Sequence, residues 1–108
     1  MFRLIPSKKV CRDFSLAYEL EGAQKAVDLL AKHYKVRRMK IAIDGRRVGR
    51  KYLALYVENK SYFKKDSVRK RIVLHEFYHH LVFNGKIIPE KEEWEADHYA
   101  ALVLSRVK

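Results

Sequence analysis

The chain has 108 residues, with 24 Lys or Arg and 13 Asp or Glu, so its formal net charge is +11 at pH 7. Hydrophobic residues make up 48% of it, and Gly and Pro number only 4 and 2, which excludes a disordered or collagen-like chain and predicts one compact domain over residues 1–108. The surplus of positive charge favours contact with nucleic acid, anionic lipid or acidic peptides.

The sequence predicts a cytoplasmic protein that does not insert into a membrane. No apolar run approaches the roughly 20 residues that cross a bilayer, and the apolar stretch at the start is too short for a secretory signal. The single cysteine, Cys11, excludes an internal disulfide and any Cys-rich zinc module. Abundant Lys, Arg and Glu beside one Gln and no Thr suggest a thermophilic source.

The first half of the chain changes from a helical to a strand pattern. A helix is predicted from an N-cap at Asp13 or Ser15 to Tyr34, interrupted at Gly22, which leaves residues 1–12 as an N-terminal extension. Two strands are then predicted. These strands, residues 36–43 and 51–58, are expected to pair as a hairpin or to lie side by side in a small sheet. Residues 61–63 are expected to form a short third strand or to begin a loop.

The second half reads as two helices. Asp66 or Ser67 caps a helix that ends at Asn84 and Gly85, and Pro89 opens a last helix with a Glu-rich first turn. The predicted fold class is therefore α+β: a small single domain with about three helices and a small antiparallel or mixed sheet, in which the last two helices pack together.

The pattern His75-Glu76-Phe77-Tyr78-His79 places two imidazoles four residues apart on the first of these helices. Residues at this spacing lie on one helical face, so both rings reach a single metal ion. Glu76 is rotated by about 100° from His75, beside the ion, where it can deprotonate a water molecule. Because this short pattern also arises by chance, it needs a third ligand.

Glu93 and Asp97, again four residues apart, supply candidates for that ligand and its support. The short connection after Gly85 lets their helix pack against the histidine helix. Glu93 would complete a three-ligand zinc site with a fourth position for water, and Asp97 would accept a hydrogen bond from a liganding imidazole.

The segment Glu93-Trp94-Glu95-Ala96-Asp97-His98-Tyr99-Ala100 resembles the E-x-x-A-D-x-x-A signature that follows H-E-x-x-H in gluzincin metallopeptidases. The likeness is closest to relatives of the CAAX-prenyl endopeptidases and the HtpX proteases, and among these to the minimal soluble gluzincins, or minigluzincins. It is concentrated in residues 68–104. The resemblance implies a zincin-like fold in which His75, His79 and Glu93 bind one Zn2+, Glu76 is general base and acid, and Asp97 supports the ligands.

The resemblance also implies that a strand upstream of the histidine helix binds an extended peptide or protein substrate. A free sheet edge offers unpaired N–H and C=O groups to a peptide backbone. The candidate residues are Lys51, Tyr52, Leu53, Ala54, Leu55, Tyr56 and Val57. The alternative is an ordinary internal strand.

Several other polar side chains near the motifs have no predicted role in metal binding. Glu92 and Glu95 point about 100° or more away from Glu93 round the helix. His80 and His98 are expected to face solvent or to be locally bonded. No residue stands out as the group that stabilises an oxyanion.

Cys11 is a candidate zymogen ligand, because a thiolate can occupy the open zinc position and hold an enzyme latent. The alternative is a small apolar residue packed beneath the first helix; another segment, or a partner subunit in a homo-oligomer, could also block the site.

Three other functions compete with the peptidase. Clusters such as Arg46-Arg47 and Arg69-Lys70-Arg71 favour a nucleic-acid-binding module, although no motif of that class accompanies them. A repressor-cleaving regulatory protease is a second alternative. A scaffold with a purely structural zinc is the third, although such sites generally fill all four positions with protein ligands.

Overall fold

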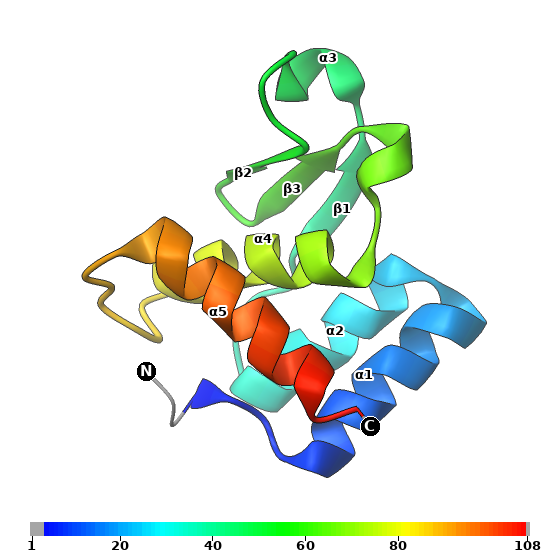
Figure 1. Ribbon diagram of the computed structural model, residues 1–108, viewed down its shortest axis with the longest axis vertical. Coiled ribbons are helices and arrows are strands. Elements are labelled where there is room, and N and C mark those ends of the chain that lie inside the picture. The colour runs from blue at the N-terminus through cyan, green and yellow to red at the C-terminus, as the bar shows by residue number, and fades with distance from the viewer. Residues whose placement is uncertain (1–3, 108) are drawn as a thin grey trace.

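A computed structural model describes residues 4–107 and has an α+β fold, in which five α-helices accompany a three-stranded mixed sheet within that range (Figure 1). The elements in chain order are α1 Lys8–Glu21, α2 Ala23–Tyr34, β1 Lys40–Ile43, α3 Gly45–Val48, β2 Ala54–Val57, β3 Lys60–Phe63, the 3₁₀ helix η2 Lys65–Ser67, α4 Lys70–Phe83 and α5 Glu92–Ser105. Between residues 4 and 107, no helix is both long enough and apolar enough to span a membrane.

The first helix begins earlier than the sequence predicts. Ser7 is its N-cap, with its hydroxyl accepting a hydrogen bond from the Val10 N–H at 3.3 Å, so Asp13 and Ser15 lie inside α1. Residues 8–12 therefore belong to the helix, and the predicted extension over residues 1–12 is wrong in that part; residues 1–3 lie outside the described range. The expected interruption at Gly22 is confirmed and separates α1 from α2.

The sheet has the strand order β1-β3-β2, which contradicts the predicted hairpin between the first two strands. β3 is central, parallel to β1 and antiparallel to β2. Asp44 does not form a hairpin turn but caps α3, accepting a hydrogen bond from the Arg47 N–H. The tight turn lies later, at Glu58 and Asn59, whose φ values of 41° and 67° are typical of two-residue hairpin turns. β2 therefore lies at one edge of the sheet.

The remaining helices enclose one core beneath the sheet (Figure 1). α4 and α5 pack against each other, as the sequence predicts, although α5 begins at Glu92 and not at Pro89. The Tyr34 and Tyr99 hydroxyls, 2.8 Å apart, link α2 to α5 through the core. The largest fully buried side chains include Phe14, Leu30, Met39, Phe63, Leu74, Phe77, Tyr78, Leu81 and Tyr99.

The break between α1 and α2 yields a test of the fold. Gly22 has φ 97° and ψ 175°, a region that only glycine occupies without strain. We expect Gly22→Ala to lower the free energy of unfolding by about 1–3 kcal/mol, measured by urea denaturation. Gly45→Ala is the matched control, because Gly45 has no positive φ and its added Cβ would meet only Lys64 Cγ at 3.8 Å. Equal stability of the two variants would contradict the strain argument.

Candidate metal centre

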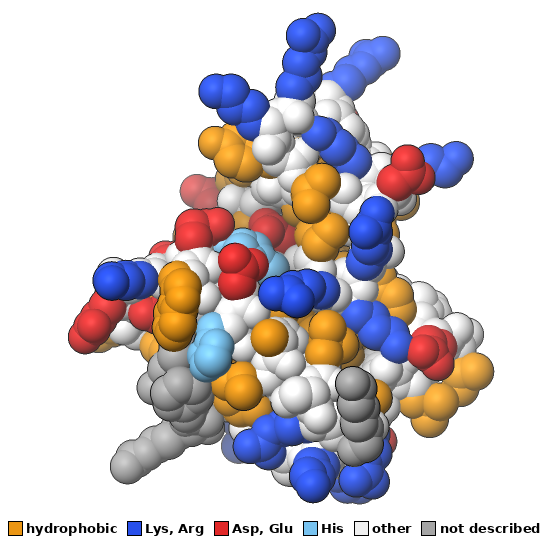
Figure 2. All heavy atoms as spheres, viewed as in Figure 1, with side chains coloured by type: hydrophobic (Ala, Val, Ile, Leu, Met, Phe, Trp, Pro, Cys, Tyr) orange, Lys and Arg blue, Asp and Glu red, His pale blue; other side chains and the backbone are white. Residues whose placement is uncertain are grey.

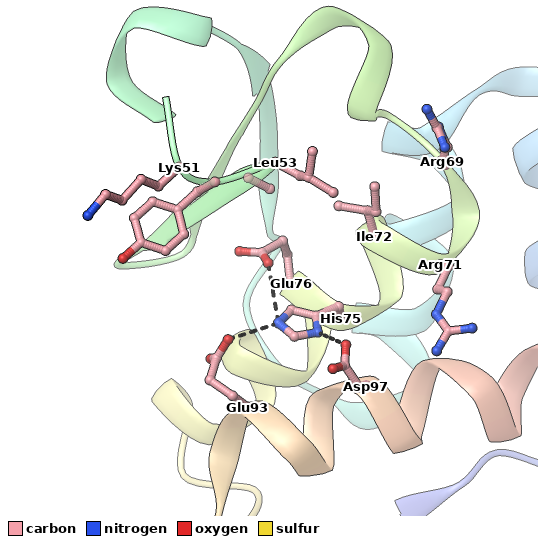
Figure 3. A pocket seen from close by; sticks show the side chains of 11 residues that line it. Lys51, Leu53, Arg69, Arg71, Ile72, His75, Glu76, Glu93 and Asp97 are labelled. Carbon is pink, nitrogen blue, oxygen red and sulfur yellow. Dashed lines mark hydrogen bonds and ion pairs between the residues drawn. The ribbon is translucent and has the colours of Figure 1, made fainter. Parts of the chain in front are cut away.

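Three side chains from α4 and α5, those of His75, His79 and Glu93, converge on one point. Figure 3 shows two of them, His75 and Glu93, facing each other. The Nε2 atoms of His75 and His79 are 3.2 Å apart. Glu93 presents one oxygen 3.2 Å from His75 Nε2 and the other 2.7 Å from His79 Nε2. Ligand atoms about 2.0–2.1 Å from a tetrahedral zinc ion lie roughly 3.3 Å from one another. The spacing of the three groups therefore fits a tetrahedral metal ion.

The hydrogen bonds on the far side of each ring decide which nitrogen carries the proton. His75 Nδ1 lies 2.7 Å from Asp97 Oδ1, and His79 Nδ1 lies 2.5 Å from Glu92 Oε2. An ionised carboxylate only accepts hydrogen bonds, so a hydrogen on each Nδ1 satisfies these contacts and leaves each Nε2 available to bind a metal ion through its lone pair. A cation shared by the two Nε2 atoms and the Glu93 carboxylate would stabilise this arrangement.

The role of Glu92 is not apparent from the sequence, which predicts no part for this residue in metal binding. Glu92 does point away from Glu93, but toward the back of the second imidazole. The two helices are antiparallel, so a step forward along α4 corresponds to a step back along α5. His79 lies four residues after His75, and its partner Glu92 lies five residues before Asp97, the partner of His75. That register is the signal that could have found it.

Glu76 lies beside the convergent group and is not part of it. Its Oε2 is 3.8 Å from His75 Nε2, and the side chain is 8% exposed. Burial raises the pKa of Glu76, while His75 and His79 lower it. A raised pKa makes a carboxylate a better proton acceptor near neutral pH, so the position and environment of Glu76 suit a general base.

Glu95 holds the start of α5 against α4. This buried carboxylate accepts hydrogen bonds from the Tyr78 hydroxyl at 2.6 Å and from the backbone N–H groups of Glu90 and Lys91 at 3.1 and 3.0 Å. The bond from Lys91 N–H, together with that from Tyr78, lowers the pKa of Glu95. Glu95 is therefore an anchor of the scaffold and not a rival ligand.

His80 is fully buried, which contradicts the solvent-facing alternative, and its ring is bonded both locally, with the Asn84 amide 3.3 Å from Nδ1, and to distant groups. Its Nε2 donates to the Arg37 carbonyl at 2.6 Å, so Nδ1 accepts from the Tyr56 hydroxyl at 2.7 Å. Burial lowers the pKa of His80, which favours this neutral form. Because Tyr56 is on β2, the contact ties the edge strand to α4. His98 stacks on Trp94, with ring centroids 5.0 Å apart.

Two adjoining cavities flank the convergent group and share Tyr52, Ala54, Glu76 and Glu93 in their walls. The first, of about 460 Å³, also contacts residues 51–53, Arg69, Arg71 and Ile72 (Figure 3). The second, of about 560 Å³, also contacts Leu55, Tyr56, His79 and Glu92. Of the predicted substrate segment, residues 51–56 line this cleft, but only Ala54–Val57 form a strand, and Val57 lines neither cavity.

Cys11 is not brought to this site. It is fully buried in α1, its thiol donates to the Pro6 carbonyl at 3.6 Å, and the only described residues that converge as possible metal ligands are the two histidines and Glu93. Burial also raises the pKa of the thiol, which disfavours the thiolate that zinc needs. The placement matches the alternative of a packed apolar residue and gives no support to latency through Cys11.

Comparison with known proteins found no matching family model, no similar curated protein and no similar solved structure. The functional argument therefore depends on the site itself, which combines two imidazoles and a carboxylate facing one point, a further buried carboxylate beside it, and a cleft on either side.

The carboxylates behind the two rings generate a prediction about metal affinity. We expect Asp97→Asn and Glu92→Gln each to weaken zinc binding by about 10–100-fold, because an amide no longer stabilises the Nδ1–H form as a carboxylate does. Glu90→Gln is the control, since Glu90 is an exposed carboxylate of the same acidic segment with no side-chain contact to either histidine. Competition with a chelating dye would measure the affinities, and an unchanged affinity in both variants would contradict the assigned roles.

The hydrogen bonds of Glu95 generate a prediction about stability and pH. Because its pKa is lowered in the folded state, its contribution is present above the unfolded pKa near 4.5 and is lost as the pH falls through the folded value. We expect Glu95→Gln to lower the free energy of unfolding by about 1–3 kcal/mol at pH 7, and the difference from wild type to shrink below pH 4.5. Denaturation curves between pH 3 and 7 would show it; a difference independent of pH would contradict it.

Proposed function

We propose that the protein is a zinc-dependent endopeptidase of the gluzincin type. The observation that carries the proposal is the convergence of His75, His79 and Glu93, with a carboxylate against the Nδ1 atom of each ring. Glu76 lies beside this group and can act as the general base. The cleft extends from the group in two directions and leaves space for a peptide chain.

The donor set favours zinc with an open coordination position. Two imidazoles and one carboxylate are a common catalytic combination for this ion, whereas structural zinc sites generally use four protein ligands. Within residues 4–107 no fourth His, Cys, Asp or Glu joins the group of possible ligands. One ion per chain with one position for water is the stoichiometry that these residues support.

Zinc bound here would supply electrophilic activation of a water molecule and of the scissile carbonyl. Glu76 accepts the proton of the attacking water and later delivers it to the leaving amine. Glu76 lines both cavities, so its carboxylate borders the space in which the water and the substrate would lie. Asp97 and Glu92 hold the two imidazoles in position throughout.

β2 supplies a means of holding the substrate. It lies at the sheet edge, pairs with β3 on one side, and contributes Ala54, Leu55 and Tyr56 to the cleft on the other. An extended peptide laid along this edge gains main-chain hydrogen bonds without a requirement for a particular sequence. A peptide or an unfolded protein segment is therefore the substrate class we propose.

Replacement of Glu76 tests the proposal. We expect Glu76→Gln to retain one zinc per chain and to lose peptide cleavage by about 10²–10⁴-fold, because the amide cannot take up the proton. Metal content by mass spectrometry and cleavage of an unfolded protein would be measured together, with Glu21→Gln on α1 as control. Retained metal with unchanged cleavage would eliminate the role of Glu76, and a wild type without zinc affinity would eliminate the peptidase.

The nucleic-acid alternative keeps one supporting observation. Figure 2 shows Lys and Arg side chains projecting around the α3 end of the molecule, where Arg46, Arg47 and Arg50 are exposed. Salt-dependent binding of DNA or RNA by a protein that cleaves no peptide would favour this function over the peptidase.

A further inference from the structure

The two cavities of the cleft differ in charge. The first contains two guanidinium groups, of Arg69 and Arg71, which Figure 3 shows on the side of the cavity opposite Glu93. Both cavities contain carboxylates, Glu76 and Glu93 in each, with Asp97 added in the first and Glu92 in the second. The difference is that no Lys or Arg lines the second cavity. Lys51 also lines the first cavity, but its side chain extends away from the two arginines.

Arg71 is placed to act on whatever occupies the first cavity. It lies four residues before His75, hence one turn away on the same face of α4. It is exposed, and among residues 4–107 its side chain has no hydrogen-bond or ion-pair partner. Lys70, its neighbour, is by contrast neutralised by Glu19 at 2.6 Å.

The position of Arg71 is also unfavourable for the helix itself. The first turn of α4 contains no acidic residue, although the positive end of the helix dipole favours one there. Arg71 therefore adds little to the stability of α4. An anion held in the cavity would gain from both the guanidinium group and the helix end.

The direction of β2 decides which part of a peptide meets Arg71. The strand runs from the first cavity, at Ala54, toward the second, at Tyr56. Antiparallel pairing is the more stable of the two arrangements. It places the residues that precede the scissile bond beside Glu92 and those that follow it beside Arg71.

We propose that the first cavity is a carboxylate-binding subsite, in which Arg71 receives an acidic group located after the bond that is cleaved. This inference rests on the proposed peptidase function and adds a substrate class to it. A guanidinium group binds a carboxylate through two parallel hydrogen bonds, and Ile72 and Leu53 give the stem of an acidic side chain an apolar wall. The carboxylate can belong to Asp or Glu or to the end of the peptide chain.

A matched peptide series tests the subsite. Three quenched fluorescent peptides share one sequence and differ only after the scissile bond. The first has Glu and an amidated C-terminus, the second has Gln and a free C-terminal carboxylate, and the third has Gln and an amidated C-terminus. We expect kcat/KM to be about twofold to fivefold higher with Glu than with the doubly neutral peptide, the usual size of a partly exposed ion pair, and to lose the difference in high salt. If the peptide with the free C-terminal carboxylate is preferred instead, the subsite binds the C-terminus of the substrate. Equal rates for all three peptides would overturn the proposal.

Variants of Arg71 assign the effect to its side chain. Arg71→Gln should abolish the preference and Arg71→Glu should reverse it toward a Lys-containing peptide; both changes suit the first turn of α4, so both proteins should fold. Arg46→Glu changes the net charge equally but lies on α3 and lines neither cavity, so it should keep the preference. A preference that survives in Arg71→Glu would overturn the proposal.

Binding to Glu76→Gln separates this inference from the proposed function. Fluorescence anisotropy with the same peptides measures selectivity without cleavage. Tighter binding of the acidic peptide, with no cleavage by wild type, would retain the subsite and eliminate the peptidase. Cleavage by wild type without any charge preference would retain the peptidase and eliminate the subsite.

Discussion

The antiparallel packing of α4 against α5 is the interaction on which the site depends. Three contacts at successive levels of this interface join Asp97 to His75, Glu95 to Tyr78, and Glu92 to His79. The middle contact is buried and also fixes the start of α5 through the Lys91 N–H. A slip of one residue between the helices would therefore displace both supporting carboxylates and Glu93 together, and the three acceptors would no longer face one point.

The sequence predicts the parts of the site that one helix encodes, because a spacing of four residues places side chains on one face whatever surrounds the helix. This is true of His75 with His79 and of Glu93 with Asp97. The role of Glu92 depends on the register between α4 and α5, and no spacing within a single helix predicts that register. The burial of His80 was missed for the same reason, since its two shorter contacts, with Tyr56 and the Arg37 carbonyl, join residues that are distant in the chain.

The sheet was less predictable than the helices. Strands of four residues carry too few side chains for their alternation to specify a partner, so the direct pairing expected between residues 36–43 and 51–58 gave way to the central position of β3. The start of α1 was missed because Ser7 is followed by the polar Lys8 and Lys9, so the apolar side of the helical pattern begins only at Val10 and Cys11. The contacts that decide the strand order are tertiary, whereas the Ser7 cap on the Val10 N–H is local.

The hydrogen bond between Tyr56 and His80 has a mechanical consequence. Tyr56 lines the second cavity, and its bond couples β2 directly to the helix that carries His75 and His79. Widening the gap between strand and helix would break this bond and leave Nδ1 of a buried imidazole with only the longer contact to the Asn84 amide at 3.3 Å, which is energetically unfavourable. The bond therefore resists separation of β2 from α4. In the proposed peptidase, selection among chains would then depend on their shape as well as their charge, because a thin, extended segment would fit without this separation and a helix would require it.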